Sequence, residues 1–378
     1  MMLPVDIQCS GCGSCAAVCP KNCITMVADR EGFRYPVVAE STCVHCGLCE
    51  KACPVLKPVP VSEKTAAWAA QNRNEAVRWA SSSGGVFSAL AEDVISGGGA
   101  VCGAAYDSHF EVIHALADVP EAAERLRGAK YAQSRAEHCF PAIRERLAAG
   151  QPVLFVGTPC QCAGLKAYLG RDDEKLLTVD MICHGVPSPK VWEAYLRERA
   201  AGRKISSVNL RSKTTGWSRY CYSVEMSFED GSVYEAPQGQ DLFMQGFVRN
   251  LYLRPSCAEC SFKGISRCSD LTLGDYWGIW DQHPEFDDDK GTSLLLVHSE
   301  KGQQAWESVR DRFRAFPVAV EDALAQNPSA VKASPPHPRR ASFFRDMEHG
   351  SVIRGIQHAL GLHKEGMIKR LVRRISWR

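Results

Sequence analysis

Two short, uninterrupted apolar runs lie near the middle of the chain, at residues 152–156 and 176–182. Each run leads through a turn into apolar positions spaced for a helix, from about 163 to 169 and from about 190 to 199. Continuous apolar strands that alternate with helices are typical of a parallel sheet. The pattern therefore predicts an α/β domain in this part of the chain.

The same reading predicts further elements on both sides. A strand near 66–70, a helix over 86–95 and strands over 100–105 and 112–116 precede the two runs. After them, Tyr220, Tyr222, Val224, Met226 and Phe228 alternate with polar residues, and Asp230-Gly231 leads into a return strand through Val233. This alternation predicts an antiparallel hairpin, and a helix is expected near 242–251.

The last part of the chain differs in composition. From Asn327 onward the core-like pattern is lost, and residues 339–378 hold ten Lys or Arg against three Asp or Glu, an excess of seven positive charges. Ile368, Leu371, Val372 and Ile375 share one helical face beside basic residues. We interpret 327–378 as a basic C-terminal tail, which either contacts an anionic surface or packs on its own domain.

Cysteines dominate the N-terminal region, where the pattern C-x2-C-x2-C-x3-C-P occurs twice. Three thiolates of each run can converge on one 4Fe-4S cluster, while the fourth reaches the other cluster. The first cluster is then held by Cys9, Cys12, Cys15 and Cys53, and the second by Cys43, Cys46, Cys49 and Cys19. Zinc is the alternative, but a zinc site needs only four ligands and has no use for the third cysteine of each run.

Other features of this region fit two clusters. Gly11, Gly13 and Gly47 permit the close backbone approach and positive φ that wrapping a cluster requires. Cys23 lies outside the repeated pattern. Residues 1–57 thus closely resemble a bacterial two-cluster ferredoxin, a one-electron carrier.

Length and composition suggest the rest of the organisation. A chain of 378 residues is long for one domain, and the prolines in residues 58–64 indicate a stiff linker to a second domain over 65–326. The net charge of +2 disfavours nucleic acid as a partner. The first residues do not form a signal peptide, and no apolar run is long enough to span a membrane. We therefore expect a cytoplasmic protein in which the 18 cysteines are reduced.

The segment Ser82-Ser83-Gly84-Gly85 stands directly before the helix predicted over 86–95. Free backbone N–H groups and the positive end of the helix dipole make such a turn a good seat for phosphate. An ordinary serine N-cap is the alternative. No G-x-G-x-x-G motif follows a strand, which disfavours an ordinary nicotinamide dinucleotide site.

Six motifs together resemble the family of coenzyme F420 hydrogenase/dehydrogenase beta subunits, in the form with an N-terminal two-cluster ferredoxin. They lie at 82–85, 128–134, 157–161, 182–188, 254–260 and 269–278. The resemblance implies a domain that holds FAD and a 4Fe-4S cluster. Family members act on a deazaflavin, on sulfite-reducing partners or on a chlorophyll derivative. The resemblance further implies that Ser82–Gly85 and Lys130 lie near the FAD pyrophosphate and Asp275 near the flavin.

A third 4Fe-4S cluster is expected in this domain, held by Cys160, Cys183, Cys257 and Cys260. The first two follow the predicted parallel strands and should emerge at one edge of the sheet, and the last two form a C-x2-C pair without nearby partners. Helix starts at Cys160 and Cys183 would favour thiolates. Cys268 and Cys162 compete for these positions, and buried free cysteines remain the plain alternative.

The predicted fold is a small bacterial-type ferredoxin domain followed by a larger mixed α/β flavin and iron-sulfur domain (α+β/α/β). The predicted function is that of an oxidoreductase that passes electrons between ferredoxin-type clusters, FAD and a two-electron substrate, such as a deazaflavin or an unidentified acceptor. A flavin is needed there because clusters pass single electrons. The alternatives are a relay subunit of a larger redox complex without its own substrate, and a redox sensor. No catalytic residue is assigned.

Overall fold

The structure is a computed structural model that describes residues 3–4, 8–218 and 221–362. The amphipathic face predicted at 368–375 lies outside the described residues, as does Tyr220 of the predicted hairpin.

The N-terminal cysteine region forms a small unit of its own. It contains an antiparallel pair of strands, β1 (Ile24–Ala28) and β2 (Arg34–Val38), and two short helices, α1 (Ser14–Ala17) and α2 (Leu48–Lys51). Gly13 and Gly47 precede the two helices with φ of 77° and 74°. Positive φ is accessible to glycine at little cost, so the chain can turn sharply inside each cysteine run, as predicted.

An eight-stranded sheet forms the centre of the larger body, in the order β13-β3-β12-β11-β7-β6-β4-β5. Its strands are β3 (Ala66–Asn72), β4 (Ala100–Tyr106), β5 (Val112–Ala117), β6 (Val153–Val156), β7 (Leu176–Met181), β11 (Leu271–Asp275), β12 (Ser293–Val297) and β13 (Phe313–Val318). The four inner strands β4, β6, β7 and β11 are parallel, and the outer pairings are antiparallel. This confirms the parallel sheet predicted from the two apolar runs.

Helices cover both faces of this sheet, which explains why its inner strands are apolar without alternation. Leu154 and Val156 of β6 pack with α4 (Val86–Ser96) and α11 (Glu300–Val309). Val153 and Phe155 of the same strand pack with α6 (Phe140–Ala148) and α7 (Pro159–Leu169) on the other face. The shorter α3 (Glu75–Ala80), α5 (Pro120–Glu124), α10 (Ile279–Gln282) and α12 (Val320–Leu324) lie around the sheet.

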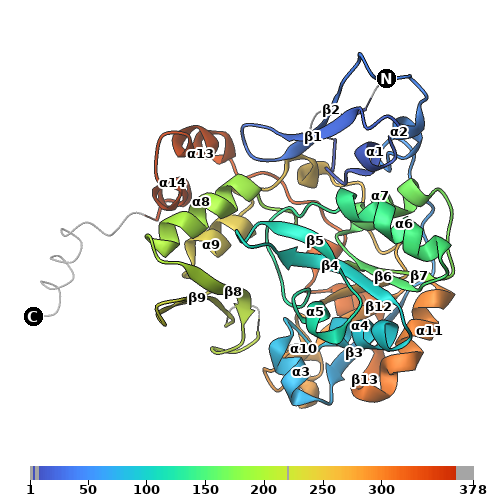
Figure 1. Cartoon of the computed structure of the whole chain (residues 1–378). Helices are drawn as coiled ribbons and strands as arrows, with labels where there is room; N and C mark the ends of the chain where they lie inside the picture. Colours follow the sequence, from blue (N-terminus) through green and yellow to red (C-terminus); the bar gives the residue numbers. More distant parts are fainter. Residues whose placement is uncertain (1–2, 5–7, 219–220, 363–378) are drawn as a thin grey trace, which may run out of the picture.

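A second core lies beside the sheet. The three strands β8 (Ile205–Ser212), β9 (Ser223–Phe228) and β10 (Val233–Pro237) pair in antiparallel fashion, and the hairpin β9–β10 is the one predicted from alternation. They pack with α8 (Pro189–Ala200), α9 (Leu242–Val248), α13 (Arg340–Met347) and α14 (Val352–Leu360) (Figure 1). Phe343, Val352 and Ile356 are buried there, so the chain beyond Asn327 contributes to a core that its sequence did not indicate.

The cysteine-rich unit packs directly on the body, over α6 and α7 (Figure 1). Arg340 forms an ion pair with Glu31, and the Ser188 hydroxyl donates to the carbonyl oxygen of Glu31. The segment that joins the two units also contacts the body, since Ser62 N donates to Arg267 O at 2.8 Å. The two units therefore share a continuous interface.

Candidate functional site

The cysteines of the first predicted cluster lie together. Burial raises the pKa of the Cys15 thiol to about 12, and the neighbouring Cys9 and Cys53 add to this effect. Cys12 is buried, and the neighbouring Cys15 and Cys9 raise its pKa further. The structure thus brings Cys53 of the second run to three cysteines of the first run, which is the arrangement that the crossed assignment predicts.

The cysteines of the second predicted cluster line a small cavity. Cys19, Cys43, Cys46 and Cys49 surround it. Cys23 joins them, because its sulfur lies 3.3 Å from the Cys19 sulfur. The repeated pattern gave no reason to include Cys23, since its position depends on the return of the chain into β1.

The four cysteines of the third predicted cluster also converge. Burial raises the pKa of Cys160, Cys183 and Cys257 to about 12 in each case. The neighbouring cysteines raise these pKa values further. Cys260 and Cys183 act on Cys160 in this way, and Cys257 and Cys260 act on Cys183. Four crowded thiols whose thiolates are unfavourable without a cation are a suitable donor set for a metal cluster. The assignment as ligands remains a prediction.

Local structure explains this convergence. Thr158 and Gln161 form a capping box that begins α7, which places Cys160 in the first turn of the helix. Cys183 follows β7 but lies six residues before α8 begins at Pro189, so it does not open a helix as expected. A Cβ on Gly185 would lie 2.8 Å from Leu253 Cδ1 and 3.3 Å from Cys257 Cβ, so this glycine lets the two segments approach closely.

The largest effect on the Cys160 thiol is the cost of removing its charge from water, which raises its pKa although the residue lies in the first turn of α7. A thiolate favoured by the helix start stays a prediction.

The two competing cysteines form a group of their own. Cys162 is fully buried, and its sulfur lies 3.6 Å from Val179 O. Burial raises the pKa of Cys268 to about 11, and Asp180 adds to this effect. Cys162 interacts with Asp180 and Cys268 more strongly than with Cys160. The geometry therefore favours Cys160, Cys183, Cys257 and Cys260 as the set that shares one site.

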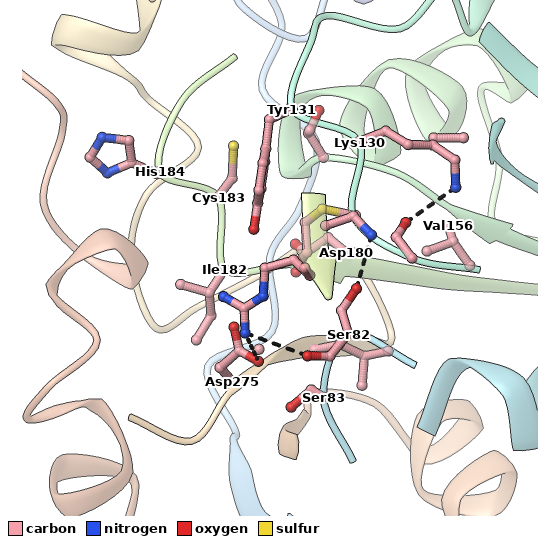
Figure 2. Close-up of a pocket in the computed structure, with 18 of the residues that line it drawn as sticks. Ser82, Ser83, Lys130, Tyr131, Val156, Asp180, Ile182, Cys183, His184 and Asp275 are labelled. Atoms are coloured by element: carbon pink, nitrogen blue, oxygen red, sulfur yellow. Dashed lines mark hydrogen bonds and ion pairs between the residues drawn. The ribbon is translucent and has the colours of Figure 1, made fainter. Parts of the chain in front are cut away.

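A cavity of about 600 Å³ lies beyond the carboxyl ends of β6 and β7 (Figure 2). Its wall includes Cys160 and Cys183 together with the predicted flavin contacts Ser82, Ser83, Gly85, Lys130 and Asp275. Gly84 faces the sheet instead, because a Cβ there would lie 2.1 Å from Ala70 O. Residues predicted separately for the flavin and for the third cluster thus border one space.

The helix α4 points its start at this cavity. Its N-cap is Gly85, with φ of 91°, and no side chain forms a capping hydrogen bond at this helix start. The serines make other contacts: Ser82 Oγ accepts from Ala129 N at 2.9 Å, and Ser83 Oγ donates to Thr292 O at 2.9 Å. The plain alternative of a serine N-cap is therefore absent here, and the first-turn N–H groups can receive an anion.

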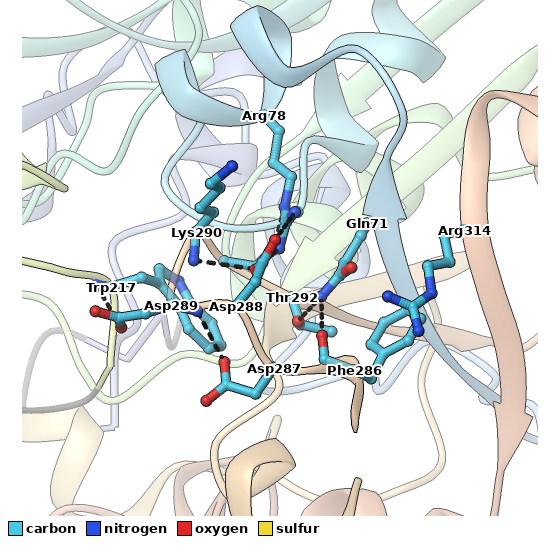
Figure 3. A network of polar contacts seen from close by, with 12 residues as sticks. Gln71, Arg78, Trp217, Phe286, Asp287, Asp288, Asp289, Lys290, Thr292 and Arg314 are labelled. Carbon is cyan, nitrogen blue, oxygen red and sulfur yellow. Dashed lines mark hydrogen bonds and ion pairs between the residues drawn. The ribbon is translucent and has the colours of Figure 1, made fainter. Parts of the chain in front are cut away.

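A polar network fixes the segment behind this turn (Figure 3). Arg78 donates to both carboxylate oxygens of Asp288 and, through Nε, to Gly291 O at 2.7 Å. Gln71 Nε2 donates to Phe286 O at 2.6 Å and to Thr292 Oγ1 at 2.8 Å. These bonds connect the end of β3 and the helix α3 to the segment 286–292. They thereby fix the position of the turn at 82–85, which borders the cavity.

Lys130 lines the cavity, but its ammonium is already engaged. Its Nζ donates to the carbonyl oxygens of Arg127 at 2.8 Å, Gly128 at 3.2 Å and Leu126 at 3.3 Å. Burial lowers the pKa of Lys130 to about 7. Its predicted contact with a pyrophosphate stays a prediction, and its observed role is to hold the turn at 126–128.

Arg211 is a cavity cation that the sequence analysis missed. Its guanidinium is buried and lies 3.1 Å from the Asp275 carboxylate, 3.9 Å above the Tyr222 ring and 5.1 Å above the Trp277 ring. Trp217 Nε1 also donates to Asp275 Oδ1 at 3.2 Å. No sequence signal marked Arg211, since it lies on β8, whose strand was not predicted.

Three buried polar atoms of the cavity-lining residues have no hydrogen-bond partner in the described structure: His114 Nδ1, Asp180 Oδ2 and Arg211 Nε. Leaving a buried polar atom unpaired costs roughly 1–3 kcal/mol. His114 Nε2 bonds to Val156 O at 3.0 Å, so its other nitrogen is free to accept. Such atoms are expected where a polar ligand completes the site.

Across the described residues, no helix is both long and apolar enough to cross a membrane.

Two family models match the chain. Residues 150–316 match the C terminus of the beta subunit of coenzyme F420 hydrogenase/dehydrogenase, and residues 8–56 match the 4Fe-4S dicluster domain.

Known proteins agree with these matches. The chain is 27% identical over 328 residues to one of the subunits of the F(420)H(2) dehydrogenase of Methanosarcina mazei. The matched region covers 80% of this chain and 82% of that protein. It is 34% identical over 67 residues to Ferredoxin-1 of Caulobacter vibrioides, covering 17% of this chain and 55% of the ferredoxin.

A chain of the F420-reducing [NiFe] hydrogenase complex from Methanosarcina barkeri matches in structure with a TM-score of 0.46 and 14% identity, covering 77% of this chain and 94% of that one. The sequence matches account for both units of the fold. The chain therefore joins a 4Fe-4S dicluster domain to a domain whose residues 150–316 match the C terminus of the beta subunits of coenzyme F420 hydrogenase/dehydrogenase.

Proposed function

We propose that the protein is an iron-sulfur flavoprotein oxidoreductase that passes electrons between its ferredoxin-type clusters and FAD, and on to a two-electron substrate. A deazaflavin such as coenzyme F420 is the first candidate substrate, because the relative from Methanosarcina mazei belongs to an F(420)H(2) dehydrogenase. The observation that carries the proposal is the single cavity bordered by the start of α4 and by Cys160 and Cys183.

The cavity suits a flavin nucleotide in size and chemistry. Its volume of about 600 Å³ falls within the roughly 300–1,000 Å³ typical of cofactor sites. The uncapped start of α4 can receive the pyrophosphate, and the unpaired atoms of His114 and Arg211 can bond to polar groups of the cofactor. Bound FAD would supply the exchange between one-electron clusters and a two-electron substrate.

The residues of the chain then have separate tasks. Cys160, Cys183, Cys257 and Cys260 would hold the third cluster at the wall of the cavity, between the ferredoxin unit and the flavin site. Asp275 holds the Arg211 guanidinium at the wall of the cavity, where Arg211 would be available to polar groups of bound FAD.

A relay subunit without its own substrate, or a redox sensor, needs clusters but no cavity of this size. The open space and its unpaired polar atoms favour the oxidoreductase over both alternatives.

We further propose that the chain works as one subunit of a larger redox complex in the cytoplasm. The relative from Methanosarcina mazei is itself named as a subunit of an F(420)H(2) dehydrogenase. A protein that devotes twelve of its 18 cysteines to clusters requires a compartment in which thiols stay reduced.

The test is anaerobic purification of the full chain, with iron, sulfide and releasable flavin counted per polypeptide. Three clusters give about twelve irons per chain. We expect one FAD per chain and reduction of F420 when the clusters are supplied with electrons. Full iron content without flavin would contradict the proposal and favour a relay or a sensor. Flavin without F420 reduction would keep the enzyme class and replace the substrate.

A further inference from the structure

Arg254 crosses the boundary between the cysteine-rich unit and the body. It directly precedes the turn that carries Cys257 and Cys260, yet its side chain reaches the other unit. Its Nε donates to Cys9 O at 2.8 Å, and one terminal nitrogen donates to Arg34 O at 3.0 Å. The remaining terminal nitrogen donates to Gln133 Oε1 at 2.8 Å.

The Arg254 guanidinium is buried without a carboxylate. The residue is 1% exposed and lies 4.3 Å above the Tyr35 ring. Among the described residues, no Asp or Glu oxygen forms an ion pair with it, whereas the comparably buried Arg211 pairs with Asp275 at 3.1 Å. A buried charge without a counter-ion is costly, so its partner is expected to be a group other than a carboxylate.

Cysteines of two predicted clusters lie close to Arg254. In the first group, Cys9 O accepts from Arg254 Nε at 2.8 Å, and in the third group, Cys257 N donates to Arg254 O at 3.0 Å. The two groups also approach each other through α7, because Cys12 lies against Gly164 of the helix whose first turn carries Cys160. Arg254 therefore lies between the first and third cysteine groups.

The first cysteine loop is shaped for this contact. A Cβ on Gly11 would lie 2.7 Å from an Arg254 terminal nitrogen and 2.5 Å from Gln133 Nε2. Gly11 also has φ of 69°. Only a glycine lets the loop approach the guanidinium this closely.

We propose that Arg254 is a positioning residue that serves as the shared counter-ion of the first and third clusters and raises the reduction potential of both. Each cluster with four thiolates is anionic, and reduction adds one electron and one more negative charge to it. A fixed cation in a poorly solvated interface favours that reduced form. Arginine stays protonated throughout, so no proton moves in this step. The inference rests on the proposed function, in which electrons pass between the ferredoxin-type clusters, the third cluster and the flavin.

The test is an electron paramagnetic resonance titration of the full chain, purified without oxygen, against ambient potential. In Arg254→Gln we expect the potentials of two clusters to fall, with an at least tenfold lower ratio of reduced to oxidised cluster at fixed potential. A tenfold change corresponds to about 59 mV for one electron. The cluster of Cys19, Cys43, Cys46 and Cys49 should keep its potential.

The matched control is Arg340→Gln. Arg340 also spans the boundary, but its charge is paired with Glu31. We expect this variant to leave all three potentials unchanged. Equal shifts of all three clusters in Arg254→Gln, no shift at all, or the same shifts in Arg340→Gln would overturn the proposal.

Gln133→Glu provides a second test if Arg254→Gln loses iron. The new carboxylate would stand where the Gln133 amide now accepts from Arg254, and would cancel its charge while keeping that hydrogen bond. The same two potentials should fall, and unchanged potentials at full iron content would overturn the proposal. The first cluster can be titrated in protein that lacks flavin or F420 activity, so this outcome is independent of the proposed enzyme function.

Discussion

The side chain of Cys12 lies directly against Gly164 in the middle of α7. A Cβ at Gly164 would be 2.8 Å from Cys12 Cβ and 3.0 Å from its sulfur. Glycine normally weakens a helix interior by about 1 kcal/mol relative to alanine. Its position here lets the first cysteine group approach the helix whose first turn carries Cys160.

We predict that Gly164→Ala destabilises the protein although alanine is the better helix former. The added methyl group must push the ferredoxin unit away from α7, at a cost of about 1–3 kcal/mol for overpacking. Denaturant unfolding of the anaerobic protein would measure this, and electron transfer from the clusters to bound flavin should slow in parallel.

Gly355→Ala is the control for this substitution. Gly355 also lies inside a helix, α14, but a Cβ there would meet Phe343 at an ordinary 3.4 Å. This variant should be neutral or slightly more stable. If both alanines act alike, the close contact at Cys12 has no special role.

The sequence predicted those parts of the site that local patterns determine. Cys160 and Cys183 could be placed at one sheet edge because each follows a short apolar run, and such runs are neighbours in parallel sheets. The first two cysteine groups followed from spacing alone. In both cases the information lies within a few residues of the functional group.

Arg211, Arg254 and His114 could not be identified in this way. Each matters because of what distant segments bring to it: Asp275 to Arg211, Cys9 to Arg254 and Val156 to His114. The helix α14 was missed for a different reason. Its apolar residues Val352, Ile356 and Ala359 have helical spacing and pack on α8 and α9, but the positive charge of the region indicated a tail.

A second prediction concerns the ligands of the third cluster. Cys160→Ser and Cys183→Ser should each lower the iron content by about four per chain and slow flavin reduction, because a 4Fe-4S cluster has four cysteine ligands. Cys268→Ser is the matched control, since Cys268 is also a partly buried thiol with a raised pKa but lies with Cys162 and Asp180. Iron loss in Cys268→Ser alone would show that the ligand set is wrong.

A third prediction tests the ion pair at the cavity. Asp275→Asn leaves the buried Arg211 guanidinium without its carboxylate, and breaking a buried pair costs about 3–5 kcal/mol. Because Asp275 is partly exposed to solvent, we expect the loss of unfolding free energy to lie at or below the lower end of that range. Flavin content per chain should fall while the iron content stays at its original value. The variant Glu75→Gln, which removes a surface pair with Lys290, should change neither quantity.

The last prediction concerns acid stability and His114. Burial lowers the pKa of His114 to about 4 from an ordinary value near 6.5, so the unfolded chain binds more protons between these values. The contribution of this neutral histidine to stability is complete above pH 6.5 and is lost as the pH falls toward 4. We expect His114→Phe to flatten the dependence of unfolding free energy on pH between 6.5 and 5. Each unit by which the pKa of His114 is lowered corresponds to about 1.4 kcal/mol of unfolding free energy. His109→Phe, at a nearby exposed histidine, should keep the original slope. Equal slopes in the protein and in His114→Phe would mean that His114 is not held neutral by its burial beside β6.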